Sequence, residues 1–215
     1  MHFEILVEDD SGKIALDVLI PKILEVSKHT YKIISYKGIG RLPKDLRGKT
    51  DPQKRVLLDR LPKILAGYGK SLPPDAAVIV VVDLDKKNCK DFKQELLSIL
   101  DNCKPKPQTL FRIAIEEGEA WLLGDKKAVL AAYPKAKNKI LDTYVQDSIC
   151  DTWEKLAEAV YPGGIRVLKD LGYPQIGIAK SEWSQRIAPH IDVEKNKSKS
   201  FQVFRDGLRK LADQL

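Results

Sequence analysis

Residues 76–85 read Ala76-Ala77-Val78-Ile79-Val80-Val81-Val82-Asp83-Leu84-Asp85. An unbroken apolar run rich in valine is typical of a strand that is buried on both faces. The two-residue period of a strand directs Asp83 and Asp85 to one side and Leu84 to the other. In open α/β sheets, ligands bind at the carboxyl ends of the strands, and neighbouring carboxylates repel each other unless a cation or a proton lies between them. The stretch therefore predicts a divalent-metal site at the end of a central strand.

Three further segments, residues 3–7, 31–36 and 109–115, also read as strands, and helical patterns separate them. Alternation of this kind predicts an α/β fold with a mostly parallel sheet of about four strands flanked by helices. We expect residues 1–125 to form this core. Residues 126–215 then form a helical C-terminal extension that packs on the core, so that the chain is a single structural unit.

Local signals place the ends of several helices. Ser11 is a plausible N-cap for the helix after the first strand, and Pro21 should kink or split that helix. The pair Asp51-Pro52 is a good helix start, because proline suits the first helical position. We expect Gly67 and Gly69 to end the helix that begins there.

Composition sets the broad class of the protein. The 215 residues are 43% hydrophobic and 31% charged, as in ordinary globular proteins. There is no apolar run long enough for a transmembrane helix, and the N-terminus lacks a signal pattern. Cys89, Cys103 and Cys150 are too widely spaced for a zinc cage, which favours reduced thiols and a cytoplasmic location.

The net charge of +7 and the pI of about 9.1 favour polyanionic partners such as DNA or RNA, although a merely basic surface explains them equally well. Residues 37–51 form a loop rich in glycine and lysine that includes Arg41 and Lys44. Basic side chains on a flexible connection suit phosphate contacts. The alternative is a solvated loop, and the spacing of a P-loop is missing.

Acids follow three of the predicted strands. Glu8 follows the first strand, Asp83 and Asp85 end the third, and Glu116 and Glu117 follow the fourth. Because the carboxyl ends of parallel strands share one edge, these carboxylates could converge there. Oxygen-rich sites of this kind suit Mg²⁺ or Mn²⁺. Each acid alone is equally compatible with a turn or a helix cap.

Two of these segments resemble the TOPRIM fold of topoisomerases, primases and OLD-type nucleases. They are Ile5-Leu6-Val7-Glu8 with the polar turn after it, and Val81-Val82-Asp83-Leu84-Asp85. Residues 111–125 and 196–204 are more specific, and they resemble the TOPRIM-like domain-of-unknown-function family numbered 4276. That resemblance implies a nuclease of mobile-element or phage-defence loci, often encoded beside an AAA-type ATPase partner.

The turn after Glu8 departs from the TOPRIM pattern E-G-x-x-E. Asp9 stands at the glycine position and Gly12 stands where the second acid is expected. Asp9 or Asp10 could substitute as a ligand, or the metal site could be altered. Alternatively, Gly12 and Lys13 could place an amide and an ammonium group near a phosphate at the helix N-terminus.

The resemblance implies roles for individual residues. In a nuclease, Glu8, Asp83 and Asp85 would hold one or two Mg²⁺ ions, and Glu116 or Glu119 would bind a second metal or act as general base. Basic residues of the tail would neutralise the charge of the phosphate in the transition state. These candidates are Lys180, Arg186 and Lys197.

Structural explanations compete with some of these roles. Glu119 opens a predicted helix over residues 119–124, where an acid is favourable without any catalysis. Trp121 is more typical of a core residue than of a platform for bases. Ser198 and Ser200 are expected to cap the last helix, with Ser200 the better placed, and the alternative for this pair is a phosphate contact.

Two functional classes follow from the sequence. The first is a Mg²⁺-dependent nuclease, or another phosphoryl-transfer enzyme, that acts on DNA or RNA. The second is a non-catalytic TOPRIM-like module that binds an ATPase partner or nucleic acid as a sensor subunit, which the missing second acid favours. A small-molecule phosphohydrolase that uses the same acids is a third reading, and a homodimer is left open.

Overall fold

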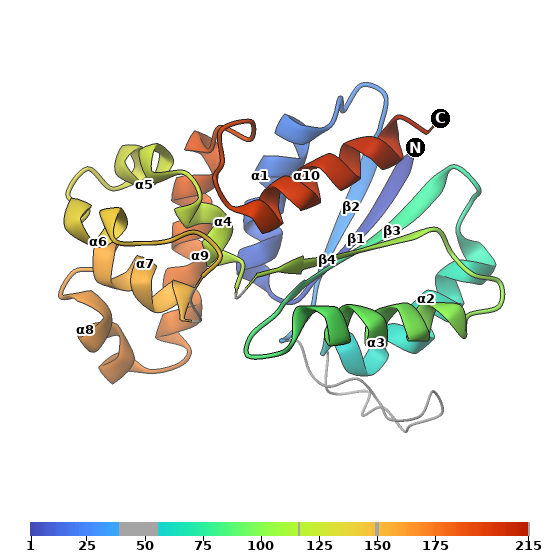
Figure 1. Cartoon of the computed structure of the whole chain (residues 1–215), viewed down its shortest axis with the longest axis horizontal. Coiled ribbons are helices and arrows are strands. Elements are labelled where there is room, and N and C mark those ends of the chain that lie inside the picture. Colours follow the sequence, from blue (N-terminus) through green and yellow to red (C-terminus); the bar gives the residue numbers. More distant parts are fainter. Residues whose placement is uncertain (39–55, 116, 149–150, 215) are drawn as a thin grey trace.

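The protein is an α/β structure built on one parallel sheet of four strands, in the order β2-β1-β3-β4 (Figure 1). The computed structural model describes residues 1–38, 56–115, 117–148 and 151–214. The strands are β1 His2–Val7, β2 Thr30–Ser35, β3 Ala76–Asp83 and β4 Thr109–Ala114. This confirms the α/β class and the four-stranded, parallel sheet predicted from the sequence.

The valine-rich strand β3 lies between β1 and β4, where both of its faces are covered. Its side chains alternate between two hydrophobic clusters, so that Ile79 belongs to one and Val80 to the other. β1 alternates in the same way, with Ile5 in the first cluster and Leu6 in the second. Because both of its faces are covered, β3 shows no polar face, whereas β1 begins with the half-buried polar residues His2 and Glu4 on the face of Leu6.

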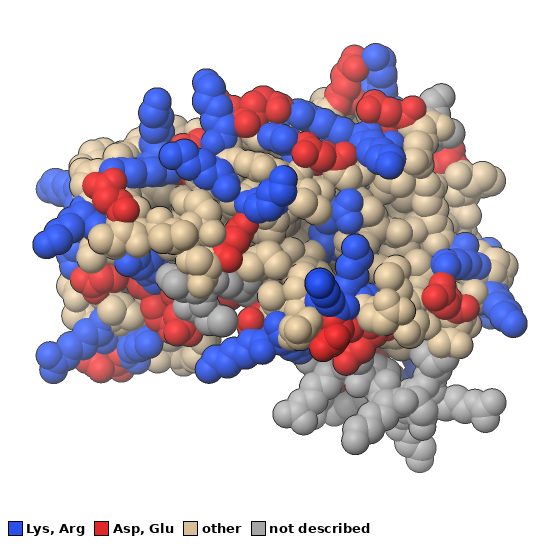
Figure 2. All heavy atoms as spheres, viewed as in Figure 1, with Lys and Arg blue, Asp and Glu red and all other residues tan. Residues whose placement is uncertain are grey.

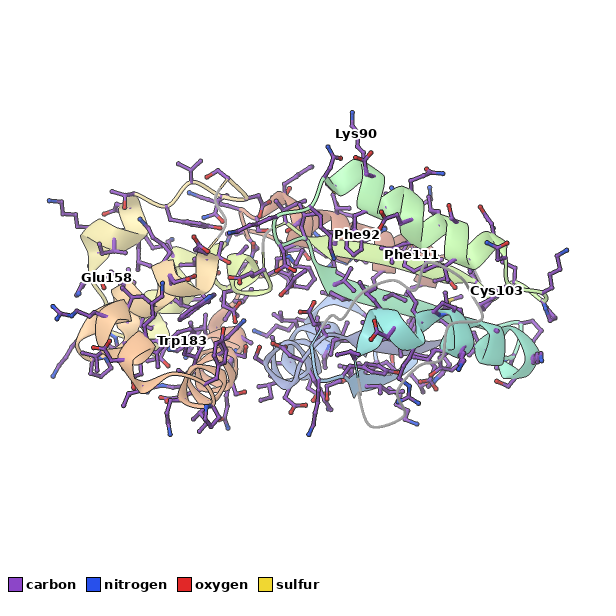
Figure 3. The ribbon with its side chains drawn as sticks, turned by 90° about the horizontal axis from the view of Figure 1, so that it is seen from below. Lys90, Phe92, Cys103, Phe111, Glu158 and Trp183 are labelled. Carbon is purple, nitrogen blue, oxygen red and sulfur yellow. The ribbon has the colours of Figure 1, made fainter. Side chains whose placement is uncertain are left out.

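Helices cover both faces of the sheet (Figure 1). On one face lie α1 Asp10–Ile23 and α10 Lys199–Ala212, and on the other lie α2 Leu57–Ser71 and α3 Cys89–Asp101. Phe92 of α3 and Phe111 of β4 lie in the second cluster, between this helix and the sheet (Figure 3).

The remaining helices form a second layer toward which the carboxyl ends of the strands point (Figure 1). They are α4 Glu119–Leu123, α5 Lys126–Ala132, α6 Asn138–Asp142, α7 Thr152–Val160, α8 Gly164–Leu171, α9 Gln175–Ile187 and the short 3-10 helix η1 Ala188–His190. One hydrophobic cluster runs from Phe3 of the sheet to Trp183 of α9, so the layer and the sheet share a core. None of the helices in the described ranges is long and apolar enough to cross a membrane.

The structure corrects the expected cap and break of α1. Asp9, not Ser11, is the N-cap, because the Asp9 carboxylate accepts the Gly12 N–H at 2.7 Å. The Ser11 hydroxyl instead donates to Asp9 at 3.0 Å, so both side chains serve the same turn. Pro21 does not split the helix, which continues through it to Ile23.

The expected end of α2 is also wrong, because the helix continues through Gly67 and Gly69 to Ser71. At Gly69 the backbone approaches the Pro105 carbonyl so closely that an added Cβ would lie 2.0 Å from its oxygen. This glycine therefore serves a close contact between chain segments and does not end the helix. The helix start expected at Asp51-Pro52 lies outside the described residues.

The segment before α10 and the start of α10 contact α4 of the second layer. Trp121 is 4% exposed and stacks on Phe204 with ring centroids 4.9 Å apart, which confirms its place in the core. Ser198, not Ser200, caps α10, because its hydroxyl accepts the Phe201 N–H at 3.2 Å. The Ser200 hydroxyl accepts the indole N–H of Trp121 at 2.9 Å, so it has a structural partner of its own.

Candidate acidic site at the carboxyl edge of the sheet

The pairing of β1 with β3 brings the first two acids together. Val7 lies opposite Val81 in the parallel register, so both strands deliver their following residues to one edge of the sheet. There the backbone N–H of Asp83 donates to Glu8 Oε2 at 3.2 Å. Two carboxylates that are distant in sequence therefore become neighbours through strand order alone.

A third acid reaches the site from the turn after β4. Gly118 lies beside Asp83, since an added Cβ on this glycine would lie 4.0 Å from Asp83 Oδ1. Glu119 then opens α4 with only 3% of its surface exposed. In the described part of the chain, its Oε2 atom makes no hydrogen bond.

Lys180 of α9 supplies a positive charge at this point. Its Nζ lies 3.3 Å from Glu119 Oε2, with side-chain exposures of 17% for the lysine and 3% for the glutamate. The separation gives an ion pair without the alignment of a hydrogen bond to that oxygen. Lys180 also interacts electrostatically with Asp83, Asp9 and Glu117.

We call the acids that interact electrostatically with one another or with Lys180 at this edge the acidic cluster. Its members are Glu8, Asp9, Asp83, Asp85, Glu117 and Glu119. A cluster of carboxylates around one lysine carries more negative charge than that lysine neutralises. The remaining negative charge has to be neutralised by protons or by further cations.

The pKa values of the buried members show this imbalance. Burial raises the pKa of Glu8 to about 7, and the neighbouring charges of Asp9 and Asp85 add to the effect. Burial likewise raises the pKa of Glu119 to about 7, although Lys180 opposes it. The pKa of Asp83 lies well above its usual range because of burial and then because of Glu8. In Lys180, burial lowers the pKa, but the surrounding carboxylates outweigh it and the net shift is upward.

A small cavity of about 40 Å³ adjoins these side chains, and apolar residues of the sheet, α1 and α4 form much of its wall. Glu8, Asp83 and Glu119 contribute to its wall, together with Ser11 and Ser184. A buried water needs only about 10–15 Å³ of such space. The cavity therefore has room for a small ion together with one or two water molecules.

The carboxylates fit the requirements of Mg²⁺ more closely than those of a metal held entirely by protein. No group of three or more His, Cys, Asp or Glu side chains within the described ranges is arranged to hold a metal ion. Mg²⁺ is commonly bound through one or two carboxylates and completes its octahedron with water and substrate phosphate. Glu8 and Asp83 offer such a pair, in a cluster whose carboxylates outnumber its one lysine.

The other predicted acids occupy different places. Asp85 is exposed, and it stands in a left-handed turn with φ of 49°, so it acts on Glu8 through charge and does not line the cavity. Glu117 Oε2 accepts the Thr152 hydroxyl at 3.0 Å and the Trp153 N–H at 3.1 Å, and it thereby holds the start of α7. Glu116 lies outside the described residues.

Of the predicted basic residues in the described ranges, only Lys180 joins the acids. Lys13 pairs with Asp17 at 2.6 Å on the exposed side of α1. Arg186 pairs with Glu182 at 3.0 Å and lies over the ring of Tyr133, 4.3 Å from its centroid. Lys197 lines a separate pocket of about 960 Å³ between α5, α6 and the segment after η1. Arg41 and Lys44 lie outside the described residues.

No sequence pattern marks Ser184, which is 3% exposed and lines the cavity from α9. It lies four positions after Lys180, so both residues share one face of that helix.

The distribution of surface charge does not indicate where the site lies. On the face drawn in Figure 2, basic and acidic side chains alternate and do not form one basic patch.

A family comparison agrees with the extent of this fold. The model of the family described as Domain of unknown function (DUF4276) matches residues 7–209, which include both layers, and the chain belongs to this family. No curated protein and no solved structure shows a significant match to the chain.

Proposed function

From membership in this family of unknown function, and from the acidic cluster, we propose that the protein is a Mg²⁺- or Mn²⁺-dependent nuclease with a TOPRIM-like site. The observation that carries the proposal is the contact between Glu8 and Asp83 at the ends of adjacent parallel strands. The raised pKa of both carboxylates supports it, because a divalent cation would relieve the repulsion that burial intensifies.

The residues suit the steps of phosphodiester hydrolysis. A bound divalent cation would polarise the scissile phosphate and lower the pKa of an attacking water. Glu8 and Asp83 would hold that cation from neighbouring strands. Glu119, with a pKa of about 7, can accept or release a proton near neutral pH. The ammonium group of Lys180 can neutralise negative charge that develops on the phosphate.

One observation favours the alternative, a non-catalytic binding module. Lys180 already provides a counter-charge inside the acidic cluster through its pair with Glu119. A lysine in this position can replace a metal ion structurally, as a buried cation that is permanently paired. The ATPase partner and the defence role implied by the family resemblance stay predictions.

Thermal unfolding with and without Mn²⁺ tests the metal site. We expect saturating Mn²⁺ to raise the Tm of the wild type by about 5 °C, because a ligand that binds only the folded state stabilises it. Asp83→Asn should abolish this response. Asp170→Asn, which changes an exposed acid of α8, is the matched control and should respond like the wild type.

The same proteins are then incubated with labelled single-stranded DNA, duplex DNA and RNA in Mn²⁺. Cleavage by the wild type and by Asp170→Asn, but not by Asp83→Asn, supports a nuclease. A Tm response without cleavage of any substrate favours the binding module. If Mn²⁺ changes neither the Tm nor the substrates, the metal-dependent function is wrong.

A further inference from the structure

A groove of about 680 Å³ runs between α1 and α9 and adjoins the acidic cluster. Asp9 and Ser11 line both this groove and the small cavity at Glu8 and Asp83. Lys180 lines the groove and reaches Glu119, which belongs to the cavity wall. We call this feature the α1–α9 groove. A ligand in it lies directly beside the carboxylates.

The α1–α9 groove has an apolar side. Tyr36, which follows β2 and also packs against the second hydrophobic cluster, lines this side, and Ile14 and Ile178 contribute aliphatic surface. Ile178 is 57% exposed although it is a large hydrophobic residue. Tyr173, which is 78% exposed, precedes Pro174 at the wall of the groove. Exposed apolar surface beside a polar pocket is typical of a binding site.

The groove also has charged and hydrogen-bonding groups. Lys37 and Lys180 provide positive charge, and Ser181 provides a hydroxyl. Three acids also line the groove: Asp9 caps α1, Asp10 accepts the Ser35 hydroxyl at 2.5 Å, and Glu182 pairs with Arg186. An aromatic and aliphatic surface next to lysines suits a ligand with a flat, apolar part and a phosphate.

We propose that the α1–α9 groove binds one unpaired nucleotide of a nucleic-acid strand, so that the protein acts on single-stranded segments. The base lies against Tyr36 and Ile178, and the phosphate points along Lys37 and Lys180 toward Glu8 and Asp83. This inference rests on the proposed function, because it takes the acidic cluster as the place where the phosphate is held.

The volume of the groove favours an unpaired nucleotide over a duplex. Pockets for one small ligand occupy about 300–1,000 Å³, a range that includes this groove. In a duplex, each base is stacked and paired, so it must leave the helix before it can enter a pocket. A single strand offers its bases without that cost, and aromatic side chains bind them with little regard to sequence.

Fluorescence anisotropy with a labelled 12-nucleotide strand tests the inference. DNA and RNA versions are each measured as the single strand and as the blunt duplex with its complement, in Mn²⁺. We expect the wild type to bind a single strand at least about tenfold more tightly than the duplex, because its bases are accessible. A gel of the same samples reports whether the strand stays intact, so binding is measured independently of cleavage.

Variants assign the binding to the groove. Tyr36→Leu should weaken binding of the single strand about tenfold, because it removes an aromatic surface for the base. Ile178→Ser and Lys37→Ala, which change exposed side chains, should each weaken it about threefold or more. The matched controls are Val203→Ser and Lys90→Ala, exposed residues of α10 and α3, and they should bind like the wild type.

The outcomes separate this inference from the proposed function. Selective binding of an uncut single strand, weakened in Ile178→Ser and Lys37→Ala, supports the groove while it overturns the nuclease. Cleavage without preference for single strands, or unchanged binding in both of these variants, overturns the groove and leaves the nuclease standing. Equal affinity for duplex and single strand overturns the inference in either case.

Discussion

Lys180 Nζ lies 3.3 Å from Glu119 Oε2 in a setting where both side chains are largely withdrawn from solvent. The two residues come from α9 and α4, which belong to the second layer, yet their charges act on Asp83 at the end of the central strand. The lysine therefore connects the helical layer to the acidic edge of the sheet. Its removal tests how much of the stability depends on this connection.

We expect Lys180→Met to lower the free energy of unfolding at pH 7 by about 3 kcal/mol, because it leaves a buried carboxylate without its partner. At pH 5 the loss should be smaller, since the carboxyls of Glu8 and Glu119, with pKa values of about 7, are then protonated. Urea denaturation at the two pH values measures both effects. Lys13→Met removes an exposed pair with Asp17 and should cost less than about 1 kcal/mol. Equal losses in the two variants would show that the pair of Lys180 and Glu119 contributes no more than a surface contact.

Because of Glu8, we expect the stability of the metal-free protein to depend on pH. The pKa of Glu8 rises from 4.5 to about 7 on folding, so between these values the folded state binds more protons than the unfolded state. The contribution of Glu8 to stability is therefore present below pH 4.5 and is lost as the pH rises toward 7. We expect Glu8→Gln to reduce the decline in stability between pH 5 and pH 7 by about 1–3 kcal/mol. Glu95→Gln, an exposed change on α3, should decline like the wild type, and a parallel decline in all three proteins would contradict the assignment.

Metal binding should release protons if the acidic cluster is the site. Near pH 6, Glu8 and Glu119 are largely protonated because their pKa values are about 7, and a cation binds the deprotonated form. We expect Mn²⁺ to displace about one proton. Calorimetric titrations in two buffers with different ionisation enthalpies measure this number. Identical heats in both buffers, together with clear binding, would place the metal elsewhere.

The fold could be predicted from the sequence because its strands are recognisable from local runs of apolar residues. The run of valines in β3 and the apolar segments of β1 and β4 are short, continuous and separated by helical patterns, which is enough to predict a parallel sheet. Strand order then brings Glu8 to Asp83. The acids of the site were therefore accessible to sequence reasoning, since they depend on the regular part of the fold.

The partners of these acids depend on contacts between distant segments, which no local pattern encodes. Lys180 and Arg186 lie on the same helix and were equally good candidates, yet the packing of α9 takes Lys180 to Glu119 and Arg186 to Tyr133. The capping error has a similar origin. Ser198 and Ser200 are both suitable caps, and the indole of Trp121 takes the hydroxyl of Ser200.

We expect substitution of Asn196 to lower the stability of the fold without changing the acidic cluster. This residue is 1% exposed, its Nδ2 donates to the Trp121 carbonyl at 2.8 Å, and its Oδ1 accepts the Ser198 N–H at 3.0 Å. Asn196→Ala would leave both backbone groups buried without partners, so we expect a loss of about 2–4 kcal/mol in urea denaturation. Gly124→Ala should be similarly costly, because its Cβ would lie 2.0 Å from Asn196 Oδ1.

The two variants remove the same contact from opposite sides, so their effects should not add. A double variant Gly124→Ala/Asn196→Ala should lose less free energy of unfolding than the sum of the single changes, since the smaller alanine at 196 leaves room for the added Cβ. Folded fractions of each single variant should keep the Tm response to Mn²⁺, because neither residue belongs to the acidic cluster. Strict additivity would show that Gly124 is required for another reason. A lost Mn²⁺ response in well-folded Asn196→Ala would show that the hydrogen bonds of Asn196 also position the acids.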